Sequence, residues 1–321
     1  MAHRFVSVGM ALGSAVAAIG LLPGLCAAEP IPGDNALQTP AASDAQKSKE
    51  VQDALAQFKK GDEEGALKLL KTAVQKHAEL PPAQVIMAEW FSNVNQPARV
   101  RSCLEQAVAD EPDDPQAYLV LGELALQDRM VAEGGLLFEK AYSLAKSSKE
   151  ISLRTTAIRK RALGGLAAAA ESQQDWKAGQ QHLEALLAEE PKDAGALLRL
   201  GRMLFHLKKP DEALARFRQA SKLNETFPGA EATLAQLYQR AGDPQNAGKW
   251  MLAAIQADPR DFNTRLIAAR WSYEIGRYDQ AEEQAKAAVQ LNPESLDAKL
   301  VRGVIALVRK DYKTAEEYLQ K

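Results

Sequence analysis

The side chains that most often carry chemistry in proteins are histidines and cysteines, and this 321-residue chain has few of either. Its histidines are His3, His77, His182 and His206. No two of them stand four residues apart, the spacing that places two zinc ligands on one face of a helix. The sequence places no base beside Cys103 to activate its thiol, so we expect a half-buried structural thiol there. We therefore predict no metal site and no thiol chemistry.

One segment has the outline of a phosphate-binding loop. The segment GDPQNAGKW, at 242–250, has five residues between its glycines where that loop has four, and Trp250 replaces the Ser or Thr that holds magnesium. No Gly-x-Ser-x-Gly elbow of a hydrolase occurs. The formal net charge is −2, so no overall basic field attracts nucleic acid. We predict that the protein is not an enzyme and has no cofactor, no nucleic-acid partner and no evident small-molecule substrate.

Residues 1–28 have the composition of a secretory signal peptide. Arg4 precedes a long uncharged stretch, and small residues stand just before Glu29. We therefore expect export, with a periplasmic or envelope location for the mature chain. Two alternatives stay open: the stretch remains as a membrane anchor, or Cys26 carries the lipid of a bacterial lipoprotein, although Leu25 stands where that motif has Gly or Ala. Any membrane contact would come through this segment alone.

Residues 29–46 and the chain after them differ sharply in pattern. Residues 29–46 are rich in Pro, Ala and small polar residues and lack helical periodicity, so we expect a flexible linker. From residue 47 the sequence repeats every 34 residues, and each unit divides into two amphipathic helices. The units are 47–80, 81–114, 115–148, 160–193, 194–227, 228–261, 262–295 and a partial 296–321, with an insertion at 149–159.

The residues that recur in these units have mechanical roles in a helical hairpin. A glycine closes the first helix because it adopts a positive φ without steric cost, and the aspartate after it caps the second helix. Two small residues, seven positions apart, let neighbouring helices approach closely. The closing glycines are Gly61, Gly242 and Gly276, and the capping aspartates are Asp62, Asp175, Asp243 and Asp311. The first small residue is Ala66, Ala213, Ala247, Ala281 or Ala315, and the second is Ala73, Ala107, Ala141, Ala220, Ala254 or Ala288.

These units resemble the tetratricopeptide repeat family over residues 47–321. In AYLVLGELAL (117–126) the family's aromatic-x-x-Leu-Gly signature is matched by Tyr118, Leu121 and Gly122. Its aromatic site in the second helix is filled by Phe138 and Phe217. The resemblance implies an all-α fold, an α-solenoid in which stacked helical hairpins form a right-handed superhelix with a concave groove. It also implies that the partners are proteins or peptides.

In this family the first helices of the units line the groove. By that resemblance, six side chains on three successive units point inward: Arg202, Phe205, Gln236, Gln239, Arg270 and Tyr273. Two guanidiniums and two aromatic rings suit a peptide that carries carboxylates, whereas an ordinary solvated lining is the alternative. The Lys–Asn clamp of the cytosolic chaperone-binding members is absent, so the sequence does not support binding of chaperone tails.

The insertion at 149–159 is helical in its spacing and basic in its charge. We expect it to extend the first helix of the next unit toward its N-terminus, by roughly 16 Å for eleven residues. The basic side chains are Lys146, Lys149, Arg154, Arg159, Lys160 and Arg161. They form either a solvated face or a docking patch for an acidic partner.

Two functions fit the pattern. The first is a non-catalytic, exported scaffold that binds partner proteins; the resemblance makes an envelope secretion or polysaccharide-export assembly a plausible setting. The second is a docking arm of a larger envelope enzyme or transporter whose active domain follows Lys321. Because repeat arrays generally finish with a polar capping helix, and the last unit stops within its second helix, we expect this chain to be a fragment of a longer protein.

Overall fold

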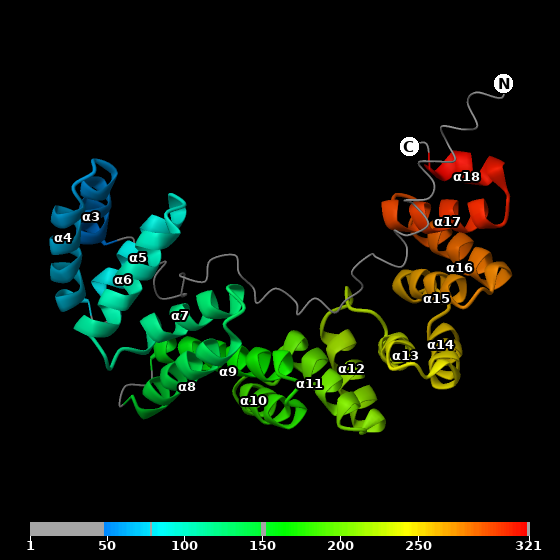
Figure 1. Cartoon of the computed structure of the whole chain (residues 1–321), viewed down its shortest axis with the longest axis horizontal. Helices are drawn as coiled ribbons and strands as arrows, with labels where there is room; N and C mark the ends of the chain where they lie inside the picture. The colour runs from blue at the N-terminus through cyan, green and yellow to red at the C-terminus, as the bar shows by residue number, and fades with distance from the viewer. Residues whose placement is uncertain (1–47, 78, 149–151, 320–321) are drawn as a thin grey trace. The chain divides into compact units, whose positions relative to one another are not determined.

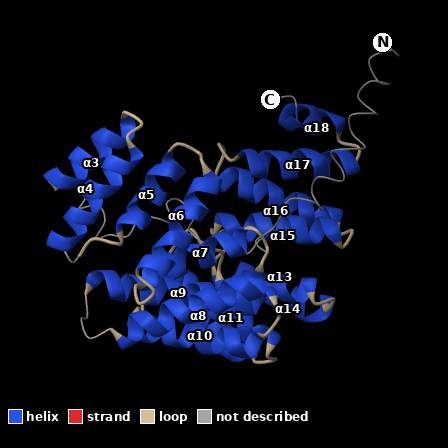
Figure 2. Cartoon of the chain, turned by 60° about the vertical axis from the view of Figure 1, so that its left-hand side comes forward, coloured by secondary structure: helices blue, strands red, loops and turns tan. Residues whose placement is uncertain are grey.

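The computed structural model describes residues 48–77, 79–148 and 152–319, and every regular element within these ranges is an α-helix (Figure 2). The predicted all-α fold is confirmed for this part of the chain. The predicted signal peptide and linker lie outside it, as do Lys149 and the two residues after it. The described residues divide at Pro191 into two compact units, an N-terminal unit and a C-terminal unit, each of which has its own helix pairs (Figure 1).

The N-terminal unit contains four helix pairs. In each pair the two helices pack against each other, and the second helix of a pair contacts the first helix of the next. The pairs are α3 (Lys49–Lys59) with α4 (Glu63–Lys76), α5 (Ala83–Asn93) with α6 (Pro97–Asp110), α7 (Pro115–Gln127) with α8 (Val131–Ser147), and α9 (Leu153–Ser172) with α10 (Trp176–Glu189).

The C-terminal unit repeats this arrangement, and some first helices of successive pairs touch in both units: α7 with α9, α13 with α15 and α15 with α17. Its pairs are α11 (Ala194–His206) with α12 (Pro210–Leu223), α13 (Ala230–Arg240) with α14 (Pro244–Ala257), α15 (Phe262–Glu274) with α16 (Tyr278–Leu291), and α17 (Leu296–Val308) with α18 (Tyr312–Leu319). Within each unit the contacts are therefore those of a stacked repeat, in which a hairpin packs on its neighbours.

One backbone feature recurs in every pair: a residue with positive φ between the first helix and the second. The predicted left-handed glycines are confirmed, and five other residues adopt the same conformation at the fifteenth position of the 34-residue frame. The complete set is Gly61, Asn95, Arg129, Gln174, Lys208, Gly242, Gly276 and Lys310. The insertion lengthens the stretch of sequence between two successive residues of this set, Arg129 and Gln174. The repeat frame therefore fixes this turn even where the sequence offers no glycine.

The aspartates after these turns cap the second helices as predicted. Asp62 accepts a hydrogen bond from the backbone N–H of Gly65 at 2.9 Å, and Asp243 accepts one from Asn246 at 3.0 Å. Such caps satisfy donors that a helix leaves without an intrahelical partner. A second set of caps opens first helices, at Asp114, Asp193 and Asp261. The sequence analysis did not identify this second set.

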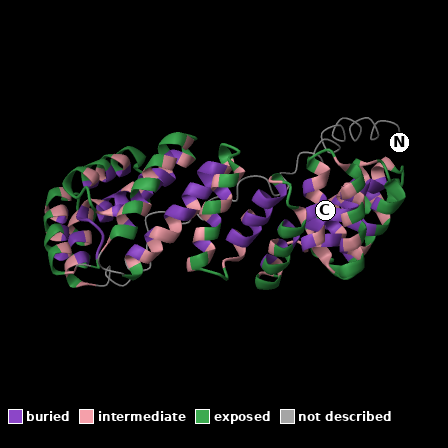
Figure 3. Cartoon of the chain, turned by 90° about the horizontal axis from the view of Figure 1, so that it is seen from below, coloured by how far each residue is buried: buried purple, intermediate pink, exposed green. Residues whose placement is uncertain are grey.

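The core lies along the faces by which helices contact each other, whereas loops and outer faces are exposed (Figure 3). All the predicted small contact residues of the second helices are buried, as are the two phenylalanines. The Phe138 ring lies between two glycines, Gly122 of α7 and Gly165 of α9. A Cβ atom added at Gly122 would lie 3.0 Å from that ring, and one at Gly165 would lie 2.5 Å from it. The close approach of the ring therefore favours glycine at both positions, and more strongly at Gly165.

The insertion lengthens two helices, and not only the one predicted to grow. Helix α9 has 20 residues where α7 and α11 have 13, and α8 has 17 where α10 and α12 have 14. The N-terminal extension of α9 is thus confirmed. The predicted 16 Å was too large, because seven extra helical residues span about 10 Å. Ser152 ends the extension with a capping box shared with Thr155.

Candidate partner-binding surface

The six side chains predicted to line a groove all lie in the C-terminal unit, on the first helices of three successive pairs. Arg202 and Phe205 lie on α11, and the remaining residues occupy the same two positions, ninth and twelfth, of the next two units. These are Gln236 and Gln239 on α13, and Arg270 and Tyr273 on α15. Asp193 caps α11 by accepting from the N–H of Ala196 at 2.9 Å, and this fixes where the helix begins.

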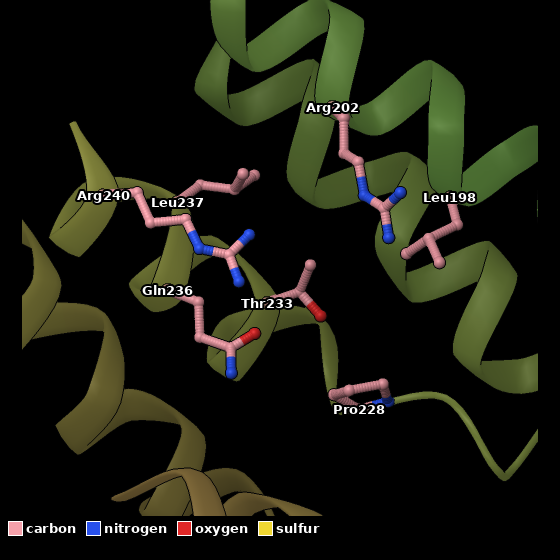
Figure 4. A pocket seen from close by; sticks show the side chains of 7 residues that line it. All are labelled: Leu198, Arg202, Pro228, Thr233, Gln236, Leu237 and Arg240. Carbon is pink, nitrogen blue, oxygen red and sulfur yellow. The ribbon is translucent and has the colours of Figure 1, made fainter. Parts of the chain in front are cut away.

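Two of these six side chains meet in a pocket between α11 and α13 (Figure 4). The pocket has a volume of about 300 Å³, including the open space at its mouth. The charged and polar groups that point into it are Arg202, Gln236 and Arg240, with Thr233 between them. Its apolar walls are Leu198, Leu237 and Pro228. The arrangement offers positive charge and amide hydrogen bonding beside an apolar surface.

Arg202 is the most unusual member of this pocket. Its side chain is only 8% exposed, so the expectation of a solvated groove lining is wrong at this position. No ion pair or hydrogen bond joins the Arg202 side chain to another described residue, although it faces the pocket (Figure 4). The guanidinium nitrogens of Arg202 keep contact with solvent. The pocket therefore presents a positive charge that no described side chain neutralises.

Phe205 is also buried, with 8% of its surface exposed, and it packs against the ring of Tyr238 on α13. The two ring centroids are 5.0 Å apart and the planes meet at 87°, an edge-to-face contact. Burial raises the pKa of Tyr238. Phe205 thus serves as a contact between α11 and α13, and the alternative of an ordinary solvated lining is wrong for this residue.

The other four predicted residues have partners of different kinds. Gln239 accepts a hydrogen bond from the indole N–H of Trp271 at 3.1 Å. Arg270 lies 3.5 Å from a carboxylate oxygen of Asp297 on α17. The ring of Tyr273 packs near that of Tyr278, with centroids 5.8 Å apart, and Gln236 lines the pocket of Arg202. The structure therefore brings Arg202 and Gln236 together, while Arg270 is paired elsewhere.

The repeat frame explains why two arginines at the same position differ. Asp297 pairs with Arg270 and is the second residue of the unit that follows the unit of Arg270. The corresponding residue after the Arg202 unit is Gly229, which has no side chain. Arg240, Thr233 and the apolar walls were missed in the sequence analysis because they occupy other positions of the frame. The absent charge at Gly229 is the sequence signal that points to this pocket.

The N-terminal unit uses the same two frame positions for a buried ion pair. Glu123, ninth in its unit, accepts from Arg161, second in the next, with Nη2 of the arginine 2.8 Å from both carboxylate oxygens. Burial raises the pKa of Glu123 to about 7, although the Arg161 guanidinium opposes the shift. Arg154 similarly donates to Asp114 at 2.6 Å and to Gln116 at 2.8 Å. These contacts hold α9 against α7.

Two further basic residues near the insertion, Arg159 and Lys160, pair with the C-terminal end of α10. Arg159 Nε donates to a carboxylate oxygen of Glu189 at 2.7 Å, and Lys160 Nζ donates to Glu190 at 2.9 Å. The interpretation of these residues as an open patch for an acidic partner is therefore wrong, because neighbouring helices already neutralise their charges. The side chain of Lys160 is still 31% exposed, in agreement with a solvated face.

Other candidate chemistry is sparse within the described ranges. Cys103 is free and half-buried, as expected, and burial raises the pKa of its thiol. Burial lowers the pKa of His182, and His77 lies 3.4 Å from Glu79. Among residues 48–77, 79–148 and 152–319, no three His, Cys, Asp or Glu side chains gather closely enough to hold a metal ion. In the same ranges no helix has the length and apolarity needed to span a membrane.

Comparison with known proteins gives one clear family match. A family model described as tetratricopeptide repeat matches residues 93–149, 165–231, 209–262 and 269–321, together more than half of the chain. The chain is also 28% identical, over 234 residues, to cellulose synthase operon protein C of Xanthomonas axonopodis pv. citri (strain 306). That alignment covers 72% of this chain but only 14% of the relative, so the chain spans a small part of that protein's length.

Solved structures with related folds have lower sequence identity. A tetratricopeptide repeat protein from Parabacteroides merdae ATCC 43184 is 18% identical, with a TM-score of 0.46, over 74% of this chain and 90% of that one. PilW, a type IV pilus biogenesis factor, is 16% identical, with a TM-score of 0.44, over 69% of this chain and 94% of that one.

Proposed function

Since the chain belongs to the tetratricopeptide repeat family, we propose that it is a non-catalytic, exported scaffold that binds a protein or peptide partner in the cell envelope. Stacked helical repeats present extended surfaces for partners rather than enclosed active sites. The observation that carries the proposal is the pocket of Arg202, because the guanidinium of this largely buried residue has no described counter-charge and gains one when an acidic ligand binds.

The partner lies on the face formed by α11, α13 and α15, where the six predicted residues stand. Gln236 and Arg240 line the pocket, while Phe205, Gln239, Arg270 and Tyr273 hold the helices that shape the face. A polysaccharide-export or secretion assembly is the proposed setting. The name of the relative refers to a cellulose synthase operon, which supports the polysaccharide part of this setting.

Photo-crosslinking in cells of the native host tests the binding face. A photoreactive amino acid at position 240, at the exposed Arg240 beside the pocket, is expected to trap one partner protein. The control carries the same group at Leu252, an exposed residue of the second helix α14. Equal trapping from both positions, or no trapping from either, would contradict a partner site on the first helices.

Export needs a test of its own, because the prediction of export and the prediction of partner binding are independent of each other. The N-terminal sequence of the protein purified from its native host is expected to begin near Glu29, after removal of the signal peptide. Recovery of a chain that still begins at Met1 from a soluble cytosolic fraction would exclude export. A lipid on Cys26 would instead favour the lipoprotein alternative.

A second candidate function is the docking arm of a larger envelope enzyme or transporter. The observation that favours it is that the chain corresponds to 14% of the length of its curated relative. The reading frame after Lys321 separates the two candidates. A long further domain with its own pocket would favour the docking arm, whereas a frame that closes after a capping helix would favour the self-contained scaffold.

A further inference from the structure

We propose that the pocket between α11 and α13 binds one carboxylate of a peptide, with Arg202 as its ion-pair partner and Gln236 as a hydrogen-bond donor beside it. The inference rests on the proposed peptide-binding function and deepens it, because it names the group that is recognised. It also distinguishes the two arginines of the face, because Arg270 already lies 3.5 Å from a carboxylate oxygen of Asp297 whereas Arg202 has no described counter-charge.

The first argument comes from ion pairs that the chain already makes. A charge at the ninth position of a unit pairs with a charge at the second position of the next unit in two places. Glu123 pairs with Arg161 in the N-terminal unit, and Arg270 pairs with Asp297 in the C-terminal unit. The polarity is reversed between the two pairs, so the geometry, and not one particular residue type, brings these positions together.

At Arg202 the same geometry has no second member. The residue at the second position of the next unit is Gly229, and the Arg202 side chain is 8% exposed with no described hydrogen-bond or ion-pair partner. The fold therefore holds a guanidinium at the ninth position of one unit but supplies no carboxylate at the second position of the next. A ligand carboxylate completes the pair, and a charge-assisted bond of this kind is about twice as strong as a neutral one.

The second argument comes from the walls of the pocket. Leu198, Leu237 and Pro228 present carbon surface on the approach to Arg202, which suits the methylene groups of an acidic side chain. The hydroxyl of Thr233 already donates to the carbonyl of Gly229 at 3.1 Å. Most of the pocket's volume of about 300 Å³ is open space at its mouth, so a carboxylate reaches Arg202 from the surface. A Glu or Asp side chain, or a peptide C-terminus, supplies the required carboxylate.

The test uses peptides selected from a random library displayed on phage against the full chain and then synthesised. The selected peptides are expected to share one carboxylate, and removing it should weaken binding about 30-fold or more. Amidation of the C-terminus and replacement of the acidic side chain by its amide, made separately, identify which carboxylate enters the pocket. Binding is measured by fluorescence anisotropy at low salt.

Three variants of the protein assign the site. Arg202→Gln is expected to weaken binding by the same factor, whereas the matched variant Arg270→Gln should change it less than about threefold. Gln236→Glu supplies a carboxylate from inside the pocket, beside Arg202 and one helical turn from Arg240. It should abolish binding while the melting temperature stays the same or rises. This last variant separates a lost site from a lost fold.

The outcomes distinguish the pocket from the wider proposal. Selected peptides that bind Arg202→Gln and wild type equally, or that need no carboxylate, would overturn the carboxylate pocket and leave peptide binding intact. A stronger effect of Arg270→Gln than of Arg202→Gln would also overturn it. A library that yields no peptide for the wild-type chain would instead contradict the proposed peptide-binding function.

Discussion

Two adjacent glycines in α9 give the sharpest test of the packing. Gly165 faces the Phe138 ring, and a Cβ added there would lie 2.5 Å from it. Gly164 is its neighbour in the same helix, and a Cβ added there would meet no described atom within 4 Å. The two substitutions Gly165→Ala and Gly164→Ala therefore share the same change in helix propensity and differ only in contact with the ring.

The magnitudes follow from that difference. In an exposed helical position, glycine to alanine gains about 1 kcal/mol, so Gly164→Ala should raise the free energy of unfolding by about that amount. At Gly165 the same gain is opposed by overpacking, which costs about 1–3 kcal/mol and occasionally more. Because Phe138 is fully buried and also touches Gly122, the ring has little room to move. We expect Gly165→Ala to be the less stable of the two by about 2–3 kcal/mol.

Urea unfolding followed by circular dichroism at 222 nm measures both variants. Adding Phe138→Leu should rescue part of the loss in the Gly165→Ala background, because a smaller side chain makes room for the new methyl group. In a wild-type background the same Phe138→Leu change should only destabilise, since it leaves a cavity. Equal stability of the two glycine variants would refute the close approach of the ring to α9.

Three further predictions concern titration, turns and caps. Burial raises the pKa of Glu123 from 4.5 to about 7, so its contribution to the free energy of unfolding is present below pH 4.5 and lost as the pH rises through 7. The stability difference between wild type and Glu123→Gln should therefore fall by about 3 kcal/mol over that range, and a difference that grows with pH would contradict the shift. Lys208→Gly should raise stability by about 1 kcal/mol because Lys208 has a φ of 63°, and the reciprocal Gly242→Lys should lower it, as thermal melts can measure. Asp243→Ala should cost about 1 kcal/mol by removing the cap on the N–H of Asn246, whereas an unchanged melting temperature would show that the cap contributes nothing.

The fold was predictable because each recurring residue reports a local constraint that neighbouring units repeat. A glycine such as Gly242 marks a left-handed turn, the aspartate after it marks a cap, and Ala247 marks a close helix contact; the structure has all three. The repeat frame also determines the backbone conformation in units that lack these marker residues. Lys208 and Arg129 adopt the left-handed turn although neither residue favours it. Their conformation is imposed by the hairpin geometry and not by their own preference.

The candidate site was only half predictable, since a helix position tells which way a side chain points but not what it meets. Arg202 and Arg270 have the same residue type and the same frame position, and the sequence analysis therefore gave them the same role. Their environments differ because of one residue in the following unit, Asp297 in one case and Gly229 in the other. Predicting the difference requires a pairing rule between units, which becomes visible only when two such pairs are seen in the structure.

The same rule explains why the basic insertion misled the sequence analysis. A cluster of positive side chains indicates an acidic partner only if the fold leaves those charges unpaired. Arg161 and Arg154 instead reach the carboxylates of Glu123 and Asp114 on the preceding first helix. In a repeat protein the informative charge is therefore the one whose complement is missing from the next unit. By that criterion the proposed site lies at the single arginine Arg202, in a sequence region of ordinary composition, and not at the dense positive charge near the insertion.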